Sequence, residues 1–105
     1  MYRFQRWRDA LQMAPNEGTV VAVIRDYVAG IEPEAIATMP VECKRAMALS
    51  DIQSAAVTLL HAELMYRGTP EIGELLHEIA HTFAAASVRL SRLRGQSALV
   101  VPASD

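Results

Sequence analysis

The sequence contains one cysteine, Cys43, among its 105 residues. A single thiol excludes a disulfide within the chain and a zinc site built from several cysteines. It is also typical of proteins that fold in a reducing compartment, so we expect a cytoplasmic protein. Three N-terminal arginines, Arg3, Arg6 and Arg8, are not followed by the apolar segment of a secretory signal.

Long apolar runs and a strong net charge are also missing. No stretch approaches the roughly 20 apolar residues that cross a bilayer, so no membrane span is expected. The net charge of −2 gives no field that would attract nucleic acid over the whole surface. Hydrophobic residues make up 51% of the chain, which is high for a small domain with little interior. We therefore expect some of them to lie in a subunit interface, most simply that of a homodimer.

Apolar residues recur at helical spacing, and no segment favours a strand over a helix. The pattern predicts an all-α fold, a compact helical bundle of four to five helices built on a C-terminal antiparallel helical hairpin. Residues 1–95 should form a single helical domain, and 96–105 a flexible C-terminal tail. The expected helices cover 2–13, 19–29, 33–39, 50–67 and 70–94, with 41–48 as a connector of uncertain structure.

Capping residues set the expected helix ends. Thr19 should cap the second helix, and Ser50 with Gln53 forms the capping box of the fourth. Thr69, followed by a proline, should open the longest helix, and Gly95 should end it. The short connection between the last two helices predicts that they pack antiparallel, with His61 at about the height of His77.

The run His77-Glu78-Ile79-Ala80-His81 spells H-E-x-x-H. On a helix this spacing places two imidazoles one turn apart for zinc, with the intervening Glu78 as general base on a metal-bound water. A zinc site of this type needs a third protein ligand. After His81 the sequence has no further histidine, and its one acid is Asp105. The third ligand would then be His61 or Glu63 on the preceding helix, or come from a second subunit.

Two observations weigh against that hydrolase. The spacing arises by chance in roughly half a per cent of chains of this size and composition. In addition, Ile79 and Phe83 define the core side of the helix, which leaves His77, Glu78 and His81 on the polar face. The leading hypothesis is therefore a non-catalytic interaction or regulatory module with no cofactor. The alternative is a zincin-like hydrolase in which His77, His81 and His61 hold zinc.

Three further segments suggest interactions. The N-terminal arginines, joined by Arg89, Arg92 and Arg94, offer a modest basic patch for nucleic acid, although the last three also suit the negative end of their helix. Residues 84–88 are apolar or small all round, which predicts either the centre of the bundle or a two-fold interface. Finally, Lys44 and Arg45 could lower the pKa of the Cys43 thiol, although a lone cysteine is more often inert.

Four short segments resemble, in order, small helical proteobacterial proteins of unknown function. The resemblance implies an all-helical fold and brings no activity, cofactor or catalytic residue. The segments are Arg25-Asp26-Tyr27-Val28, Pro33-Glu34 with Met39-Pro40, Ser50-Asp51-Ile52, and Ala86-Ser87-Val88-Arg89-Leu90.

Overall fold

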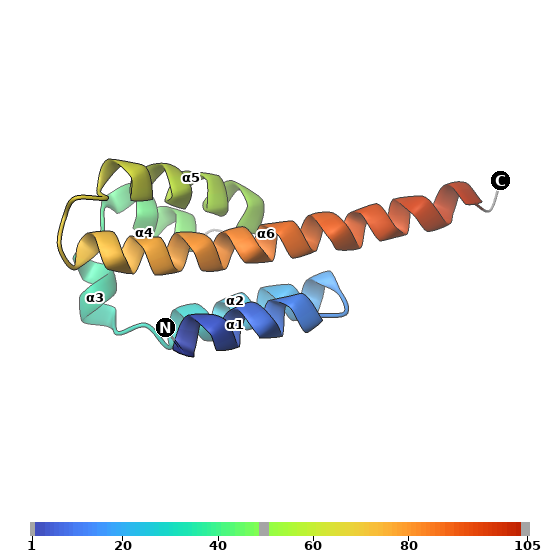
Figure 1. The fold of residues 1–105 in the computed structure, drawn as a ribbon, viewed down its shortest axis with the longest axis horizontal. Helices are drawn as coiled ribbons and strands as arrows, with labels where there is room; N and C mark the ends of the chain where they lie inside the picture. Colours follow the sequence, from blue (N-terminus) through green and yellow to red (C-terminus); the bar gives the residue numbers. More distant parts are fainter. Residues whose placement is uncertain (1, 49–50, 104–105) are drawn as a thin grey trace.

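The computed structural model describes the backbone of residues 2–48 and 51–103 and the side chains of 5–48 and 51–95. Over these residues the chain is all-α with no strand, and the predicted fold class is confirmed (Figure 1). Six helices replace the expected four to five. They are α1 (Tyr2–Met13), α2 (Glu17–Ala29), α3 (Pro33–Ala37), α4 (Val41–Ala48), α5 (Ile52–Met65) and α6 (Ile72–Ala103).

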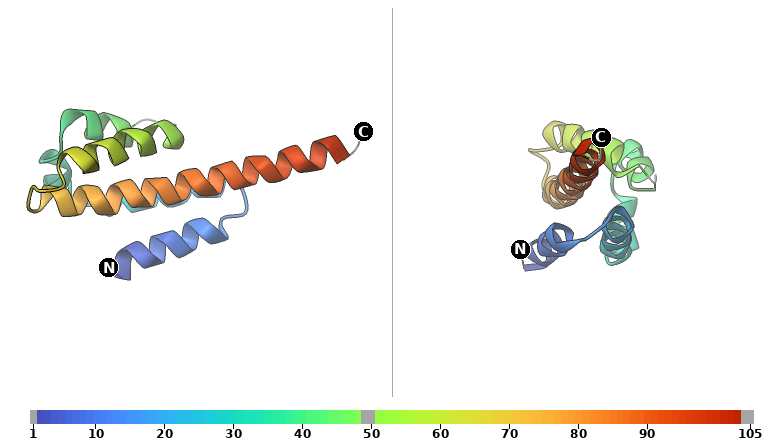
Figure 2. Two further views of the ribbon diagram at one scale, coloured as in Figure 1. Left: turned by 45° about the horizontal axis from the view of Figure 1, so that its top comes forward. Right: turned by 90° about the vertical axis from the view of Figure 1, so that its right-hand side faces the viewer.

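Helix α6 is the axis on which the other helices pack. Helix α5 lies antiparallel along one side of it, with α4 packed on α5, and α1 and α2 lie along the other side (Figures 1 and 2). The predicted hairpin of the last two helices is therefore confirmed. With 32 residues rising 1.5 Å each, α6 is about 48 Å long and spans most of the 53 Å long axis. No helix of the described chain combines the length and the apolar character that crossing a membrane requires.

The core forms where α6 meets its neighbours. Leu76, Ile79 and Phe83 of α6 are at most 1% exposed, and they pack with Leu59 of α5 and Tyr27 of α2. Burial of each large apolar side chain stabilises the fold by about 1.5–3 kcal/mol. Of the small or apolar residues at 84–88, Ala86 is fully buried in the bundle while Val88 is 50% exposed, so the segment is not covered on all sides and the choice between the two predicted arrangements stays open.

Helices α2 and α5 have caps other than the predicted ones. Asn16 caps α2, because its Oδ1 accepts hydrogen bonds from the Thr19 amide (2.8 Å) and the Thr19 hydroxyl (2.9 Å). Thr19 therefore lies inside the first turn. Asp51 caps α5, accepting at Oδ1 from the Gln53 amide at 3.1 Å. A carboxylate suits the positive end of a helix better than a hydroxyl does, which explains the shift from Ser50. Ser50 itself lies outside the described residues.

The expected connector at 41–48 is helix α4. Its inner side buries Cys43 and Ala46, which are at most 3% exposed. Contact with α5 stabilises this helix more than its own short sequence would, since an isolated helix of this length is unstable in water.

The longest helix begins two residues later than predicted. Glu71 has a φ of 66°, in the left-handed region, so the helix cannot pass through it. The Ile72 amide donates to the Pro70 carbonyl at 2.7 Å and closes a tight turn around Glu71. The connection between α5 and α6 is therefore six residues long, 66–71, and the register of the hairpin shifts.

The predicted end of this helix at Gly95 is wrong, because α6 continues to Ala103. Glycine ends a helix by adopting a left-handed conformation, and none of the described glycines has a positive φ. The backbone of the expected tail is thus helical over 96–103, while 104–105 lie outside the described residues. Flexibility of the tail stays a prediction.

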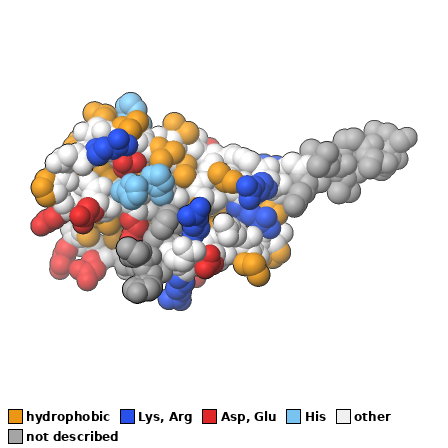
Figure 3. All heavy atoms as spheres, in the orientation of Figure 1, with side chains coloured by type: hydrophobic (Ala, Val, Ile, Leu, Met, Phe, Trp, Pro, Cys, Tyr) orange, Lys and Arg blue, Asp and Glu red, His pale blue; other side chains and the backbone are white. Residues whose placement is uncertain are grey.

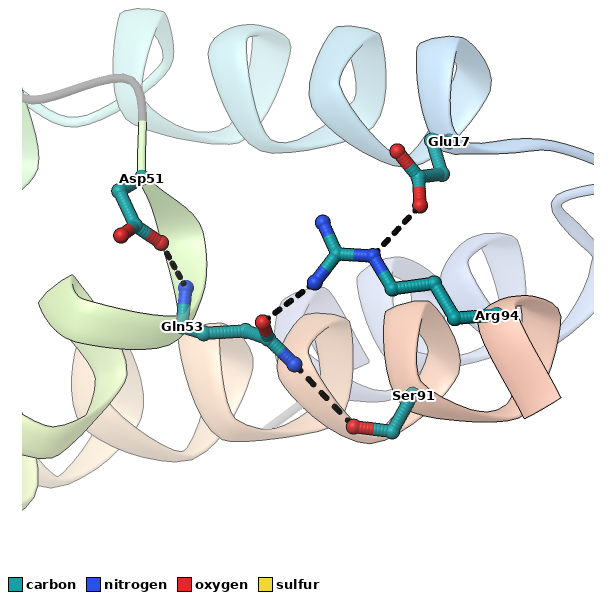
Figure 4. Close-up of polar contacts among 5 residues, drawn as sticks. All are labelled: Glu17, Asp51, Gln53, Ser91 and Arg94. Carbon is teal, nitrogen blue, oxygen red and sulfur yellow. Dashed lines mark hydrogen bonds and ion pairs between the residues drawn. The ribbon is translucent and has the colours of Figure 1, made fainter. Parts of the chain in front are cut away.

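Arginines of α6 hold the two sides of the bundle together. Arg89 donates from Nε and Nη2 to the Ala14 carbonyl at 2.9 and 2.7 Å, which satisfies an acceptor at the end of α1. Arg94 donates to Glu17 of α2 at 2.7 Å and to Gln53 of α5 at 2.6 Å (Figure 4). Gln53 in turn donates to Ser91 at 3.1 Å. These arginines therefore join helices. Their expected role at the negative end of the helix is wrong, because α6 continues to Ala103 and has no basic residue in its last turn.

Candidate metal centre

Glu63 is the one acidic side chain that is buried among the residues whose side chains are described, with 6% of its surface exposed. It belongs to the last turn of α5 and points toward α6. A buried carboxylate is costly unless charged or hydrogen-bonding groups surround it. The groups around Glu63 must therefore compensate for the burial of its carboxylate.

Three nitrogen atoms face the Glu63 carboxylate. His81 Nε2 lies 3.4 Å from Oε1, while His77 Nδ1 and Arg67 Nε lie 3.8 and 3.5 Å from Oε2. Charge-assisted hydrogen bonds between such groups are shorter, about 2.7–2.9 Å. The nitrogens thus surround the carboxylate without closing tightly on it.

The two histidines reach the site from one face of α6. Residues four apart on a helix lie one turn above each other, and the His77 and His81 ring centroids are 4.3 Å apart. Gly73 lets the first turn of α6 approach the end of α5. A Cβ atom there would lie 2.9 Å from the Tyr66 carbonyl oxygen and 3.1 Å from that of Arg67. This close approach brings the α5 carboxylate within reach of both imidazoles.

The site opens into a hollow of about 560 Å³ between α5 and α6. Histidine side chains gather there over α6, with acidic and basic side chains beside them (Figure 3). The His77 and His81 side chains are 65% and 42% exposed, so one side of the cluster faces solvent. The hollow is lined by Glu63, Arg67, Gly73, Glu74, His77 and His81.

The geometry of the cluster suits a metal ion. One ligand atom from each of Glu63, His77 and His81 can be chosen so that all three lie within 4.8 Å of one another. Tetrahedral zinc with bonds of about 2.0–2.2 Å needs ligand atoms about 3.3–3.6 Å apart. The 3.4 Å between His81 and Glu63 already fits this requirement. His77 Nδ1 lies 3.8 Å from the other carboxylate oxygen, Oε2, slightly beyond this separation.

Of the two predicted candidates on α5 for the third ligand, the structure brings Glu63 to the histidines and not His61. His61 is exposed and lines a separate hollow between α4 and α5. Two residues along a helix correspond to about 200° of rotation, so His61 and Glu63 cannot both face α6. The structure therefore groups His77 and His81 with Glu63, the other predicted candidate, and leaves His61 apart from them; metal binding by any of these residues stays a prediction.

Glu78, the predicted general base, faces a different neighbour. Its Oε2 accepts a hydrogen bond from the Tyr27 hydroxyl of α2 at 2.6 Å. One residue along the helix is about 100° of rotation, so Glu78 lies toward α2 while His77 faces the α5 groove. The H-E-x-x-H run therefore supplies two clustered imidazoles, and its carboxylate joins α6 to α2.

The structure also bears on Cys43 and on the arginines, which the sequence suggested as further sites. Burial, and next the neighbouring Glu42 carboxylate, raise the pKa of the Cys43 thiol, so the suggested lowering by Lys44 and Arg45 is wrong. Arg6 lies over the Trp7 ring, 5.3 Å from its centroid. Of the other arginines, Arg89 and Arg94 bond within the fold, whereas Arg8 and Arg92 are exposed, so the basic patch stays a prediction. The Arg3 side chain lies outside the described residues.

No protein-family model, curated protein or solved structure matches this chain. The fold and the site together define it as an all-α bundle with a His–His–Glu cluster in the groove of its C-terminal hairpin. Its resemblance to small proteobacterial proteins stays a prediction.

Proposed function

We propose that the protein is a non-catalytic interaction module that acts as a homodimer through the outer face of α5. This face is defined here by Val57, His61, Leu64 and Met65, which fall on one side of the helix. The three apolar members are 61–69% exposed, and apolar side chains lie along this edge of the molecule in Figure 3. Because the opposite side of α5 packs on α6, the helix is apolar on both sides. A helix of that kind is normally covered on both sides.

A second copy of the chain suits this face because the face is nearly uncharged. A two-fold interface brings the same patch of each subunit together, so any charge near the axis meets a like charge. The one formally charged residue of α5, Glu63, faces α6 instead. A hollow of about 350 Å³ beside the outer face, lined in part by His61 and Met65, offers room for side chains of the second copy.

A non-catalytic role is favoured over the hydrolase by the Tyr27–Glu78 hydrogen bond. A general base must reach the water that it activates, and this bond orients Glu78 toward α2. The proposed interaction role requires no cofactor. We place the protein in the cytoplasm because its one thiol, that of Cys43, is free and buried, as suits a reducing compartment.

Light scattering during gel filtration tests the dimer. At micromolar concentration we expect about twice the chain mass of 11.5 kDa. Leu64→Glu places a charge at the two-fold interface and should give monomers, whereas Met13→Glu changes an exposed apolar residue elsewhere and should leave the dimer intact. A wild-type chain that stays monomeric up to about 100 µM, a range that covers weak contacts as well, would exclude the proposal.

A further inference from the structure

We propose that Glu63, His77 and His81 bind one divalent transition-metal ion, with zinc as the expected species. The ligands would be a carboxylate oxygen of Glu63, Nδ1 of His77 and Nε2 of His81, the atoms that face one another across the α5–α6 groove. Two imidazoles and a carboxylate form a known three-ligand set for zinc, with a fourth position left for water. That fourth position would face the open hollow.

The burial of Glu63 supports a bound cation. Its side chain is 8% exposed, and its three nitrogen neighbours lie 3.4 to 3.8 Å away. An apolar residue at this position would pack between α5 and α6 without needing a counter-charge. A metal ion would supply that charge and accept one bond from each of the three side chains.

The ligand types select the class of ion. Imidazole nitrogen suits zinc, copper, nickel and iron, whereas magnesium and calcium prefer sites built from oxygen atoms alone. Two of the three ligands here are imidazoles. We therefore expect zinc to bind and calcium or magnesium at millimolar concentration not to compete.

The positive charge of Arg67 provides a second, independent test of the proposed cation site. Its Nε lies 3.5 Å from Glu63 Oε2, so the guanidinium stands where it would repel an arriving cation. The Arg67 side chain is 68% exposed and can swing into solvent when the ion binds. Removal of this positive charge should strengthen metal binding, which a purely structural Glu63–histidine contact would not produce.

The metal site does not depend on the proposed dimer. Glu63 lies about 200° around α5 from His61, so the groove and the outer face are on opposite sides of the helix. Metal binding by a monomeric chain would therefore support this inference even if the homodimer were excluded.

The inference is tested by titrating zinc into protein that was purified without a histidine tag. Binding is measured by calorimetry or by competition with a chromophoric chelator. We expect one ion per chain. His77→Gln and His81→Gln should each weaken binding at least about 10-fold, since each removes one of three protein ligands. His61→Gln is the matched control, because it removes the third histidine of the chain without touching the cluster. Glu78→Gln should also leave the affinity unchanged.

Two further variants separate the role of each charge. Glu63→Gln should weaken zinc binding, and Arg67→Gln should strengthen it, by about 3-fold or more for the loss of a nearby like charge. Circular dichroism of each variant establishes that it is folded. If Glu63→Gln fails to fold, the opposite effects of Arg67→Gln and His81→Gln still test the site. The spectrum of the wild-type chain with Co²⁺ should show the strong absorption of a four-coordinate ion.

Three results would overturn the metal site. The first is less than about 0.1 equivalent of bound zinc at tens of micromolar free ion, an occupancy that no three-ligand site would show. The second is equal loss of binding in His61→Gln and His81→Gln. The third is a stoichiometry of one ion per two chains, which would assign the ion to an interface between subunits.

Discussion

Tyr27 and Glu63 are both polar residues buried in an apolar bundle, but the distances to their polar partners differ. Tyr27 is fully buried, and its hydroxyl donates to Glu78 at 2.6 Å, a short bond to a carboxylate. Glu63 is nearly as buried, but its partners stand 3.4 Å or more away. The first arrangement stabilises the fold, whereas the second leaves room for a ligand. Stability measurements on each residue can separate the two.

Tyr27→Phe should lower the free energy of unfolding by about 1–3 kcal/mol, because the substitution leaves the Glu78 carboxylate without the hydroxyl that it accepts from. Urea denaturation monitored by circular dichroism measures the change. Tyr66→Phe is the control, since Tyr66 is only partly buried and the described structure gives its hydroxyl no hydrogen bond. Equal effects of the two substitutions would contradict the structural role of the Tyr27–Glu78 bond.

Glu63→Leu should raise the stability of the metal-free protein, by about 1 kcal/mol or more. Replacement of a buried charge and its imperfect partners by apolar packing is often neutral or stabilising. Urea denaturation in the presence of a chelator gives the comparison. If the variant is instead less stable than the wild type, the carboxylate stabilises the fold through its contacts with the imidazoles and Arg67.

At the scale of the helix, Asp51 links stability to pH. Hydrogen bonds from the Ser54 hydroxyl and then the Ser54 amide lower the pKa of the Asp51 carboxyl from its ordinary value of 3.8. A lowered pKa in the folded state means that the stabilisation is fully present above the unfolded value and is lost as the pH falls through the folded value.

We therefore expect the wild type to lose part of its stability below about pH 4, the usual pKa range of an aspartate in an unfolded chain. Asp51→Asn keeps a side chain that can cap the helix but cannot titrate, so its stability should fall less steeply over the same range. Thermal melts between pH 2.5 and 6 measure both slopes. Identical slopes would show that Asp51 does not contribute to the acid sensitivity.

A substitution at Gly95 tests whether α6 continues beyond this residue. Because α6 passes through Gly95 in a helical conformation with open space around its Cα atom, Gly95→Ala should stabilise the protein by about 0.5–1 kcal/mol. A left-handed cap at this position would give the opposite sign. Denaturation of the variant therefore decides between a helix that continues to Ala103 and a helix that ends where the sequence alone predicted.

Helix interiors were predictable from the sequence, and helix ends were not. The spacing of Leu76, Ile79 and Phe83 fixes the buried side of α6 because burial of that stripe dominates its energy. Helix ends depend on single hydrogen bonds, and several nearby residues compete to make them. Asn16 and Asp51 are both good caps, but another candidate, Thr19 or Ser50, lies within three residues of each. At Glu71 the start of α6 is set by a left-handed backbone conformation, which the residue type does not predict.

At the scale of the whole molecule, the proposed homodimer makes stability depend on concentration. Association of folded chains favours the folded state by mass action, so the melting temperature should rise as protein concentration increases. Melts at about 2 and 200 µM measure the rise, a range chosen to span the affinities of ordinary interfaces. Leu64→Glu should abolish the dependence with little effect on monomer stability, because Leu64 is 61% exposed. A wild-type melt that is independent of concentration would argue against self-association.

The sequence also predicted only part of the candidate site. The spacing of His77 and His81 guarantees that they share a face of a helix, and the hairpin made a ligand from α5 a reasonable expectation. The choice between His61 and Glu63 depended on which side of α5 packs on α6. The hollow depended on Gly73, whose missing side chain lets the two helices approach. Neither could be read from residue types alone, although a single acid on a helix otherwise free of charge was a signal for Glu63.

The contacts from Arg89 to Ala14 and from Arg94 to Glu17 join residues 75 and 77 positions apart in the chain. A ribosome synthesises α1 and α2 before α6. Until α6 has been made, the apolar sides of the first two helices that face α6 therefore have no partner surface to pack on. We infer that the α1–α2 half of the bundle acquires its native packing only after α6 has been synthesised. Until then its uncovered side chains are available to chaperones that bind exposed apolar segments.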